Sequence, residues 1–159
     1  MTRKACKRRH YALVDPIRMA MLGVAPASQS LLDEIRTRNL SAIESFARGN
    51  ATPHDWRTLA DCINVAQTMG EGGIGPEALP ACEAASEALG QAHRRYSSKG
   101  KLGMTGPQLQ SLREMHEYHD LQIQSITRGE FERWIQKTAD RIRSAHPSLK
   151  VFINPQEHA

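Results

Sequence analysis

The feature that most constrains the fold is a repeat of apolar residues three and four positions apart, which recurs in several segments of the chain. The clearest repeat follows Thr105 and reads Leu109, Leu112, His116, His119, Ile123 and Ile126. Such spacing places side chains on one face of an α-helix, whereas a half-buried strand alternates every second residue. Strand-like alternation of convincing length does not occur before residue 149. The sequence therefore predicts an all-α protein.

Glycine, proline and capping residues divide this pattern into separate helices. We expect helices over residues 15–23, 28–48, 52–70, 76–96 and 105–146. The last stretch is expected to kink or break near Gly129, where the phase of the apolar positions slips. The fold is then an irregular bundle of five or six helices. We assign residues 1–12 to a disordered basic arm, 13–147 to the helical domain and 148–159 to a C-terminal tail.

The expected core is aliphatic, because aromatic residues make up only 5% of the chain. The apolar face of the second helix includes Leu32, Ile35, Leu40, Ile43 and Phe46. The face after the break carries Phe131, Trp134, Ile135, Thr138 and Ile142. In the tail, residues 149–153 are expected to dock on the bundle or to add one edge strand. A chain of 159 residues suffices for one domain with such a core.

The cysteines point to neither a disulfide framework nor a zinc finger. Cys6, Cys62 and Cys82 are odd in number and widely spaced, and no Cys-x-x-Cys pair occurs. Cys62 and Cys82 fall within apolar helical patterns, so we expect them in the core as small hydrophobic residues. No apolar run approaches the ~18 residues of a membrane span. We therefore expect a cytoplasmic protein with no membrane partner.

The positive charge is concentrated at the N-terminus. The chain has 21 Lys and Arg against 17 Asp and Glu, and its pI is about 9.2. Five of these cations lie within the first nine residues, without an acidic neighbour: Arg3, Lys4, Lys7, Arg8 and Arg9. Each cation set against a phosphate releases a condensed counterion. The arm therefore indicates nucleic acid as a partner, with DNA favoured over RNA, or else an acidic surface on a host protein.

A second basic stretch covers residues 93–101. It holds Arg94, Arg95, Lys99 and Lys101 with no acidic residue among them. Together with the arm, and with Tyr11 and Tyr96 interleaved, it would form a phosphate-binding surface. The alternative is that these cations complement the negative end of a helix, where Lys and Arg are common.

Residues 114–120 are the one cluster dense enough in imidazole and carboxylate to suggest a metal site. His116 and His119 lie three apart, and Asp120 lies one turn after His116. Zinc-protease helices place their histidines four apart, so this spacing fits poorly. The preferred interpretation is that both histidines are partly buried, hydrogen-bonded residues of a helix seam, with a metal site as the minor alternative. Buried neutral histidines would make the fold sensitive to acid. No cofactor is expected.

Two other motifs argue against enzymatic chemistry. Gly70, Gly72 and Gly75 match the letters Gly-x-Gly-x-x-Gly, but they follow a helical pattern, whereas a dinucleotide-binding loop follows a strand. We interpret them as a joint between two helices. The chain has no Gly-x-Ser-x-Gly nucleophile elbow, and its cysteines lack a local activating pattern. We therefore expect a protein that is not an enzyme.

The sequences at 7–16, 73–83 and 118–122 resemble those of small proteins encoded on prophages and mobile elements of proteobacteria. The resemblance extends over most of the chain. The resemblance implies an origin and assigns no catalytic or binding residue. Two functions follow from the residues themselves. The first is a non-enzymatic, nucleic-acid-associated accessory or regulatory protein that contacts phosphates through its arm. The second is a helical protein-interaction module that inhibits or adapts a host protein. The seam at 109–126 pairs either within the chain or between two copies.

Overall fold

The computed structural model describes residues 24–153, and this part of the chain is all α-helical, as the sequence predicts. Its five α-helices are α2 (Gln29–Ala47), α3 (Pro53–Glu71), α4 (Leu79–Lys99), α5 (Gly106–Gln124) and α6 (Arg128–Ser144). Two short 3-10 helices, η1 (Pro76–Ala78) and η2 (Pro147–Leu149), precede α4 and follow α6. The basic arm and the helix expected at 15–23 lie outside the described residues. Within residues 24–153 no helix is long and apolar enough to span a membrane.

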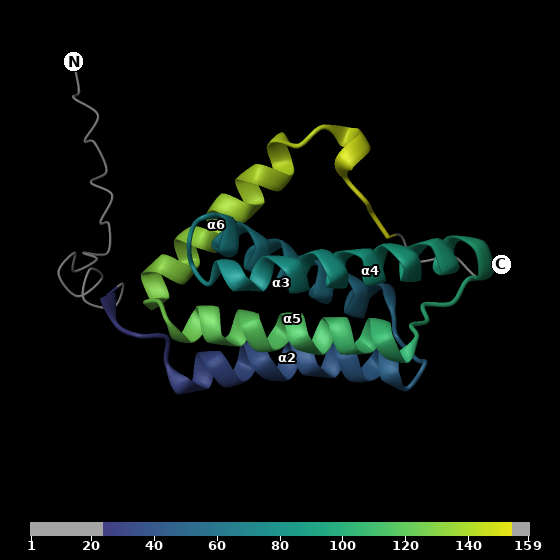
Figure 1. Ribbon diagram of the computed structural model, residues 1–159, viewed down its shortest axis with the longest axis horizontal. Helices are drawn as coiled ribbons and strands as arrows, with labels where there is room; N and C mark the ends of the chain where they lie inside the picture. The colour runs from purple at the N-terminus through teal and green to yellow at the C-terminus, as the bar shows by residue number, and fades with distance from the viewer. Residues whose placement is uncertain (1–23, 154–159) are drawn as a thin grey trace, which may run out of the picture.

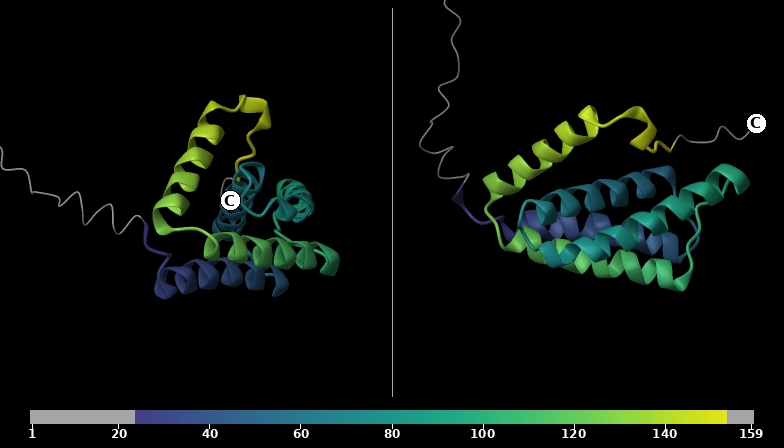
Figure 2. Two further views of the ribbon diagram at one scale, coloured as in Figure 1. Left: turned by 60° about the vertical axis from the view of Figure 1, so that its left-hand side comes forward. Right: turned by 45° about the horizontal axis from the view of Figure 1, so that its top comes forward.

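The bundle consists of two helix pairs and one helix that leans away from them. α2 lies beside α5, and α3 and α4 cross over this pair (Figure 1, Figure 2). α6 starts at the end of α5, contacts α3 and rises from the bundle, after which the chain turns back through η2 (Figure 1). The inclination of α6 leaves a cleft between this helix and the bundle.

The main core lies among α2, α3, α4 and α5. Its fully buried side chains include Leu59, Leu112 and Met115. On α4 the buried face is built from four alanines, one cysteine and one leucine: Ala81, Cys82, Ala85, Ala88, Leu89 and Ala92. A smaller cluster joins the start of α6 to the other helices through Leu32, Met69, Ile123, Ile126 and Phe131. Cys62 and Cys82 are buried and free, which confirms their expected place in the core.

Most of the predicted helix boundaries are confirmed. Ser28 caps α2, and its hydroxyl accepts from the Leu31 amide at 3.3 Å. Thr52 and Asp55 form a complete capping box at the start of α3, in which the Thr52 amide donates to Asp55 Oδ2 at 2.8 Å. Two boundaries differ. The helix expected over 76–96 continues to Lys99. The kink or break expected near Gly129 is a break slightly earlier, because Thr127 and Glu130 form a capping box that starts a new helix at Arg128.

The apolar face predicted for the second helix, which is α2, contains one error. Leu40 is 44% exposed, whereas Asn39 is 1% exposed and occupies the inward position. Asn39 lies seven residues after Leu32 and four before Ile43, so it keeps the helical phase that Leu40 breaks. An amide therefore lies where the sequence suggested an aliphatic side chain.

Residues 150–153 return to the bundle, which confirms the predicted docking of the tail. Ile153 is buried in the main core, and the Phe152 carbonyl lies 3.1 Å from Nε2 of His93. The alternative of an edge strand is not observed, because residues 24–153 contain no sheet for it to join and only one isolated bridge, between Pro26 and Thr127.

Candidate functional site

The predicted phosphate-binding residues fall into two groups, of which the structure describes one. Arg3, Lys4, Lys7, Arg8 and Arg9 lie outside the described residues. Residues 24–153 carry equal numbers of basic and acidic side chains. The excess positive charge of the chain therefore belongs to its N-terminal segment.

Two side chains of the second basic stretch, Arg94 and Arg95, form contacts within the protein. Arg94 forms an ion pair with Glu87 at 2.9 Å. Nη1 of Arg95 donates to the Gly103 carbonyl at 2.6 Å and to Gln108 Oε1 at 3.1 Å. Lys99 and Lys101 are exposed beside the C-terminal end of α4. Arg95 thus stabilises the turn between α4 and α5, whereas the Arg94 pair lies within α4, and Arg94, Lys99 and Lys101 are exposed.

The histidine cluster lies inside the bundle. His116 is 7% exposed and His119 is 3% exposed, and burial lowers the pKa of both, that of His119 to about 4. Asp120 points to another helix, where Nη2 of Arg36 on α2 contacts its Oδ2 at 2.8 Å. The described residues contain no group of three His, Cys, Asp or Glu side chains arranged to hold a metal ion. These histidines are buried seam residues.

Gln122 connects His119 to the glycine-rich joint. Nε2 of Gln122 donates to the carbonyls of Ile74 at 2.7 Å and Ala66 at 3.1 Å. These two acceptors fix the orientation of the amide, so Oε1 of Gln122 accepts from Nδ1–H of His119 at 3.2 Å. Neutral His119 therefore carries its proton on Nδ1, and its Nε2 is an acceptor.

The glycine-rich segment joins two helices, as predicted. It connects α3 to η1 and α4, and Gly75 takes a left-handed conformation with φ of 58°. At Gly72 the α3 backbone approaches α6 so closely that an added Cβ would lie 2.0 Å from Cη2 of Trp134. These glycines therefore permit a tight turn and a close helix contact.

A cleft with both apolar and buried polar side chains lies beneath α6. We call it the α6 cleft and define it by Ile35, Asn39, Cys62, His119, Phe131 and Ile135. Its volume is about 370 Å³, within the range of small-molecule sites. The predicted apolar face of α6 lines it, but that face is incompletely covered, because Ile135 is 44% exposed and Ile142 38% exposed.

Polar groups lie at both the floor and the rim of the α6 cleft. Nδ2 of Asn39 donates to Sγ of Cys62 at 3.4 Å, while Oδ1 of Asn39 is buried without a hydrogen-bond partner among the described residues. Burial raises the pKa of the Cys62 thiol to about 12, so this cysteine is not an activated nucleophile. At the exposed rim, desolvation raises the pKa of Asp61, opposed by Arg38 and Arg57.

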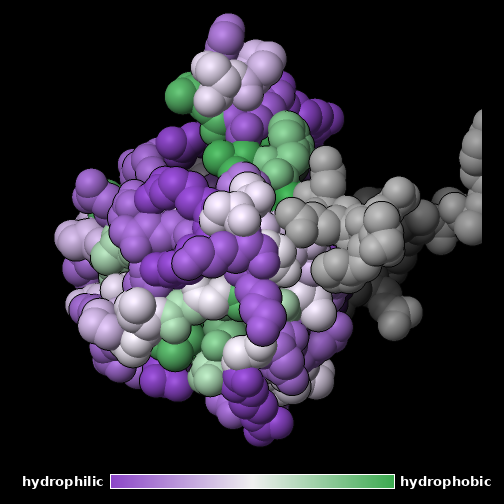
Figure 3. Space-filling view, turned by 90° about the vertical axis from the view of Figure 1, so that its right-hand side faces the viewer, coloured by the Kyte–Doolittle hydropathy of each residue, from purple (hydrophilic) through white to green (hydrophobic). Residues whose placement is uncertain are grey.

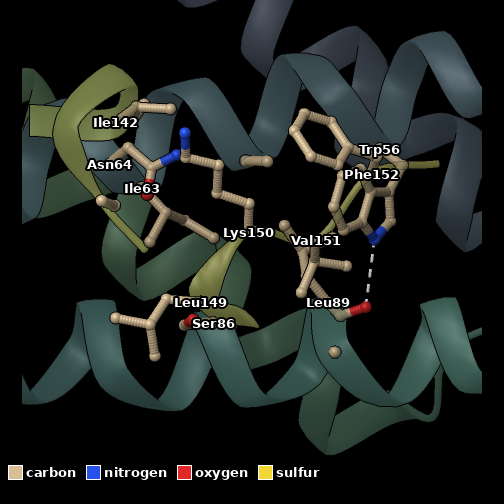
Figure 4. Close-up of a pocket in the computed structure, with 13 residues that line it drawn as sticks. Trp56, Ile63, Asn64, Ser86, Leu89, Ile142, Leu149, Lys150, Val151 and Phe152 are labelled. Atoms are coloured by element: carbon tan, nitrogen blue, oxygen red, sulfur yellow. Dashed lines mark hydrogen bonds between the residues drawn. The ribbon is translucent and has the colours of Figure 1, made fainter. Parts of the chain in front are cut away.

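A second cleft continues from the first, since Asn64 and Ile142 line both. It has a volume of about 260 Å³ and lies between α3, α4 and the returning C-terminal segment (Figure 4). Trp56 lines it and is fixed by a 3.0 Å hydrogen bond from its Nε1 to the Leu89 carbonyl. Three apolar side chains beside it are strongly exposed: Leu149 (76%), Val151 (57%) and Phe152 (70%). Figure 3 shows hydrophobic side chains gathered just below the part of the molecule that projects at the top of this view.

No family model, curated protein or solved structure matches this chain. The assignment of a site therefore rests on its own geometry.

The sequence pattern identified His119 but not the α6 cleft, Asn39 or Gln122. Asn39 was detectable as a polar residue in phase with an apolar face.

Proposed function

We propose that this protein is a non-enzymatic, nucleic-acid-associated accessory or regulatory protein. Its N-terminal arm contacts phosphates, with DNA favoured over RNA, while the helical body gives shape and a docking surface. The observation that carries the proposal is the separation of charge: residues 24–153 are balanced in charge, and the excess cations precede them. A cytoplasmic protein of prophage origin is consistent with this function.

The charge separation favours phosphate contacts for a physical reason. A cluster of like charges contributes nothing to folding and repels itself, so its presence calls for an anionic partner. In contrast, six arginines of the body pair with carboxylates within the described residues: Arg36, Arg48, Arg94, Arg128, Arg141 and Arg143. The arm is therefore the part of the chain best suited to polyanions.

The test is a salt titration of binding to labelled duplex DNA, single-stranded DNA and RNA. The full chain is compared with a variant in which Arg3, Lys4, Lys7, Arg8 and Arg9 are glutamine, and with a second variant in which Lys99 and Lys101, the exposed lysines of the second basic stretch, are glutamine. If the five arm cations contact duplex phosphates, the slope of log K against log salt falls in magnitude by about four in the arm variant. No binding by the full chain at low salt, or an unchanged slope in the arm variant, would refute the proposal.

The second candidate is a helical protein-interaction module that inhibits or adapts a host protein. It is favoured by the exposed apolar group Leu149, Val151 and Phe152 next to the second cleft. Isolated exposed apolar residues are common, but a group of them beside a cleft is typical of a docking surface. The seam at 109–126 is less suited to pairing between copies, because Leu112, Met115 and Ile123 are buried within the chain.

This candidate has its own test. Tagged protein is used to recover partners from host lysate after nuclease treatment, with the double variant Leu149→Ser/Phe152→Ser and the control Leu121→Ser. Leu121 is 62% exposed but lies on α5, away from the second cleft. A partner retained by the full chain and by the control, and lost by the double variant, supports docking at this surface. Equal recovery by all three proteins contradicts it.

A further inference from the structure

The α6 cleft contains two hydrogen-bond acceptors that nothing in the described part of the chain satisfies. One is Oδ1 of Asn39, a side chain that is 1% exposed. The other is Nε2 of His119, because the only hydrogen bond of this ring within residues 24–153 is the one from Nδ1 to Gln122. Both residues line the same cleft, Asn39 from α2 and His119 from α5.

An unsatisfied buried polar group is costly. Leaving a buried acceptor without a donor costs about 1–3 kcal/mol, so native structures rarely keep one without a reason. The Asn39 amide does not resolve the deficit by rotation, since exchanging Nδ2 and Oδ1 leaves an unpaired N–H in place of an unpaired carbonyl. In the structure Nδ2 donates to Sγ of Cys62, and the oxygen has no partner among the described residues.

Most of the remaining wall of the cleft is apolar. Val65 on α3 and Phe131, Ile135 and Ile142 on α6 contribute apolar side chains to it, and the other polar residues that line it are Arg38, Asp61, Asn64 and Thr138. A cavity of about 370 Å³ accepts a molecule larger than a few waters. Apolar walls favour a mainly hydrophobic ligand, and the two acceptors select among such ligands for one that donates a hydrogen bond.

We propose that the α6 cleft is a binding site for a small, mainly apolar molecule that carries an N–H or O–H group, donates it to Oδ1 of Asn39 and lies beside the imidazole of His119. The ligand body packs between Val65 and the exposed face of α6. Because this face is open before binding, the ligand also covers Ile135 and Ile142 and holds α6 against α3. The inference is independent of the nucleic-acid proposal, since the arm takes no part in it.

The test compares two probes that differ in one donor. Indole carries an N–H group, and 1-methylindole has the same ring without it. Binding to the full-length protein is measured by titration in ¹H–¹⁵N spectra, and the side-chain ¹⁵N signals of His119 are followed in parallel. We expect saturable binding of indole, at least tenfold tighter than that of 1-methylindole, with a shift of the His119 Nε2 signal.

A matched pair of variants locates the donor contact. Asn39→Leu removes the free acceptor, and Asn64→Leu makes the same change at the other asparagine of the cleft, which is only half-buried. We expect Asn39→Leu to weaken the binding of indole about tenfold and to leave the binding of 1-methylindole unchanged. We expect Asn64→Leu to retain the tighter binding of indole. The proposal is overturned if indole does not saturate the wild-type protein, or if the two probes bind it equally. The comparison of probes needs no variant, so it stands even where a variant fails to fold.

Discussion

Trp134 of α6 lies directly over Gly72 at the end of α3. A Cβ on Gly72 would lie 2.0 Å from Cη2 and 2.6 Å from Cζ3 of the indole, a separation that no side chain tolerates. Gly72 has φ of −84°, so the backbone itself would accept any residue. The glycine is therefore required by the neighbouring ring, and this contact fixes how closely α6 approaches the bundle.

The first prediction concerns this contact. Gly72→Ala should destabilise the protein by about 1–3 kcal/mol, because the methyl group displaces Trp134 and with it α6. Urea unfolding followed by tryptophan fluorescence gives the free energy of unfolding. The control is Gly103→Ala, whose added Cβ meets nothing within 4 Å. A Gly72→Ala protein as stable as this control would show that α6 is free to shift.

Gln122→Leu tests the link between α5 and the glycine-rich joint. The substitution removes the donor to the carbonyls of Ala66 and Ile74 and the acceptor of His119. Loss of these buried hydrogen bonds should lower the free energy of unfolding by about 1–3 kcal/mol. The matched control is Gln124→Leu, an exposed residue whose side chain donates to Asp120. Equal effects of the two substitutions would contradict a structural function of Gln122.

A third prediction compares two ion pairs. Arg36 on α2 contacts Asp120 on α5 through Nε and Nη2, and the two side chains are only 32% and 23% exposed. Arg48 and Glu44 form a one-turn pair within α2 with exposures of 69% and 51%. Double-mutant cycles to alanine should give a larger coupling free energy for the partly buried pair, because water screens it less. A coupling no larger than that of the exposed pair would show that Arg36 does not hold the two helices together.

The helix pattern was predictable because each boundary has a local cause. Thr52, Pro53 and Asp55 form a start signal within four residues, and the structure confirms it. The sequence predicts the kink or break near Gly129, slightly late, because a capping box of Thr127 and Glu130 starts α6 at Arg128. Boundaries that depend on neighbouring residues can thus be derived from sequence to within a few positions.

The cleft was not predictable, because it depends on how the helices are packed. The apolar face of α6 was identified, but the sequence does not show that α6 leans away and leaves Ile135 and Ile142 partly exposed. Leu40 and Asn39 are adjacent, and hydrophobicity favoured the wrong one as the inward residue. Which polar atom lacks a partner is likewise a property of the packed helices.

The final prediction is a loss of stability in acid that depends on His119. Burial lowers the folded-state pKa of this residue to about 4, whereas an unfolded histidine titrates near 6.5. Protonation therefore favours the unfolded chain. The free energy of unfolding should be highest above pH 6.5 and should fall as the pH drops toward 4, by about 3 kcal/mol from His119. His116, whose pKa is also lowered by burial, contributes in the same direction.

Other charged groups near His119 determine how the experiment is read. Gln122 and Asp120 favour the protonated imidazole of His119, while His116 disfavours it. Asp61 across the cleft has a raised pKa, so its contribution to the free energy of unfolding changes with pH in the opposite direction. The urea midpoint is therefore measured between pH 8 and 4 for the wild type and for His119→Gln, which keeps a donor toward Gln122 but cannot be protonated. The variant should lose less stability over this range. Parallel curves for the two proteins would mean that His119 is accommodated in its charged form within the fold.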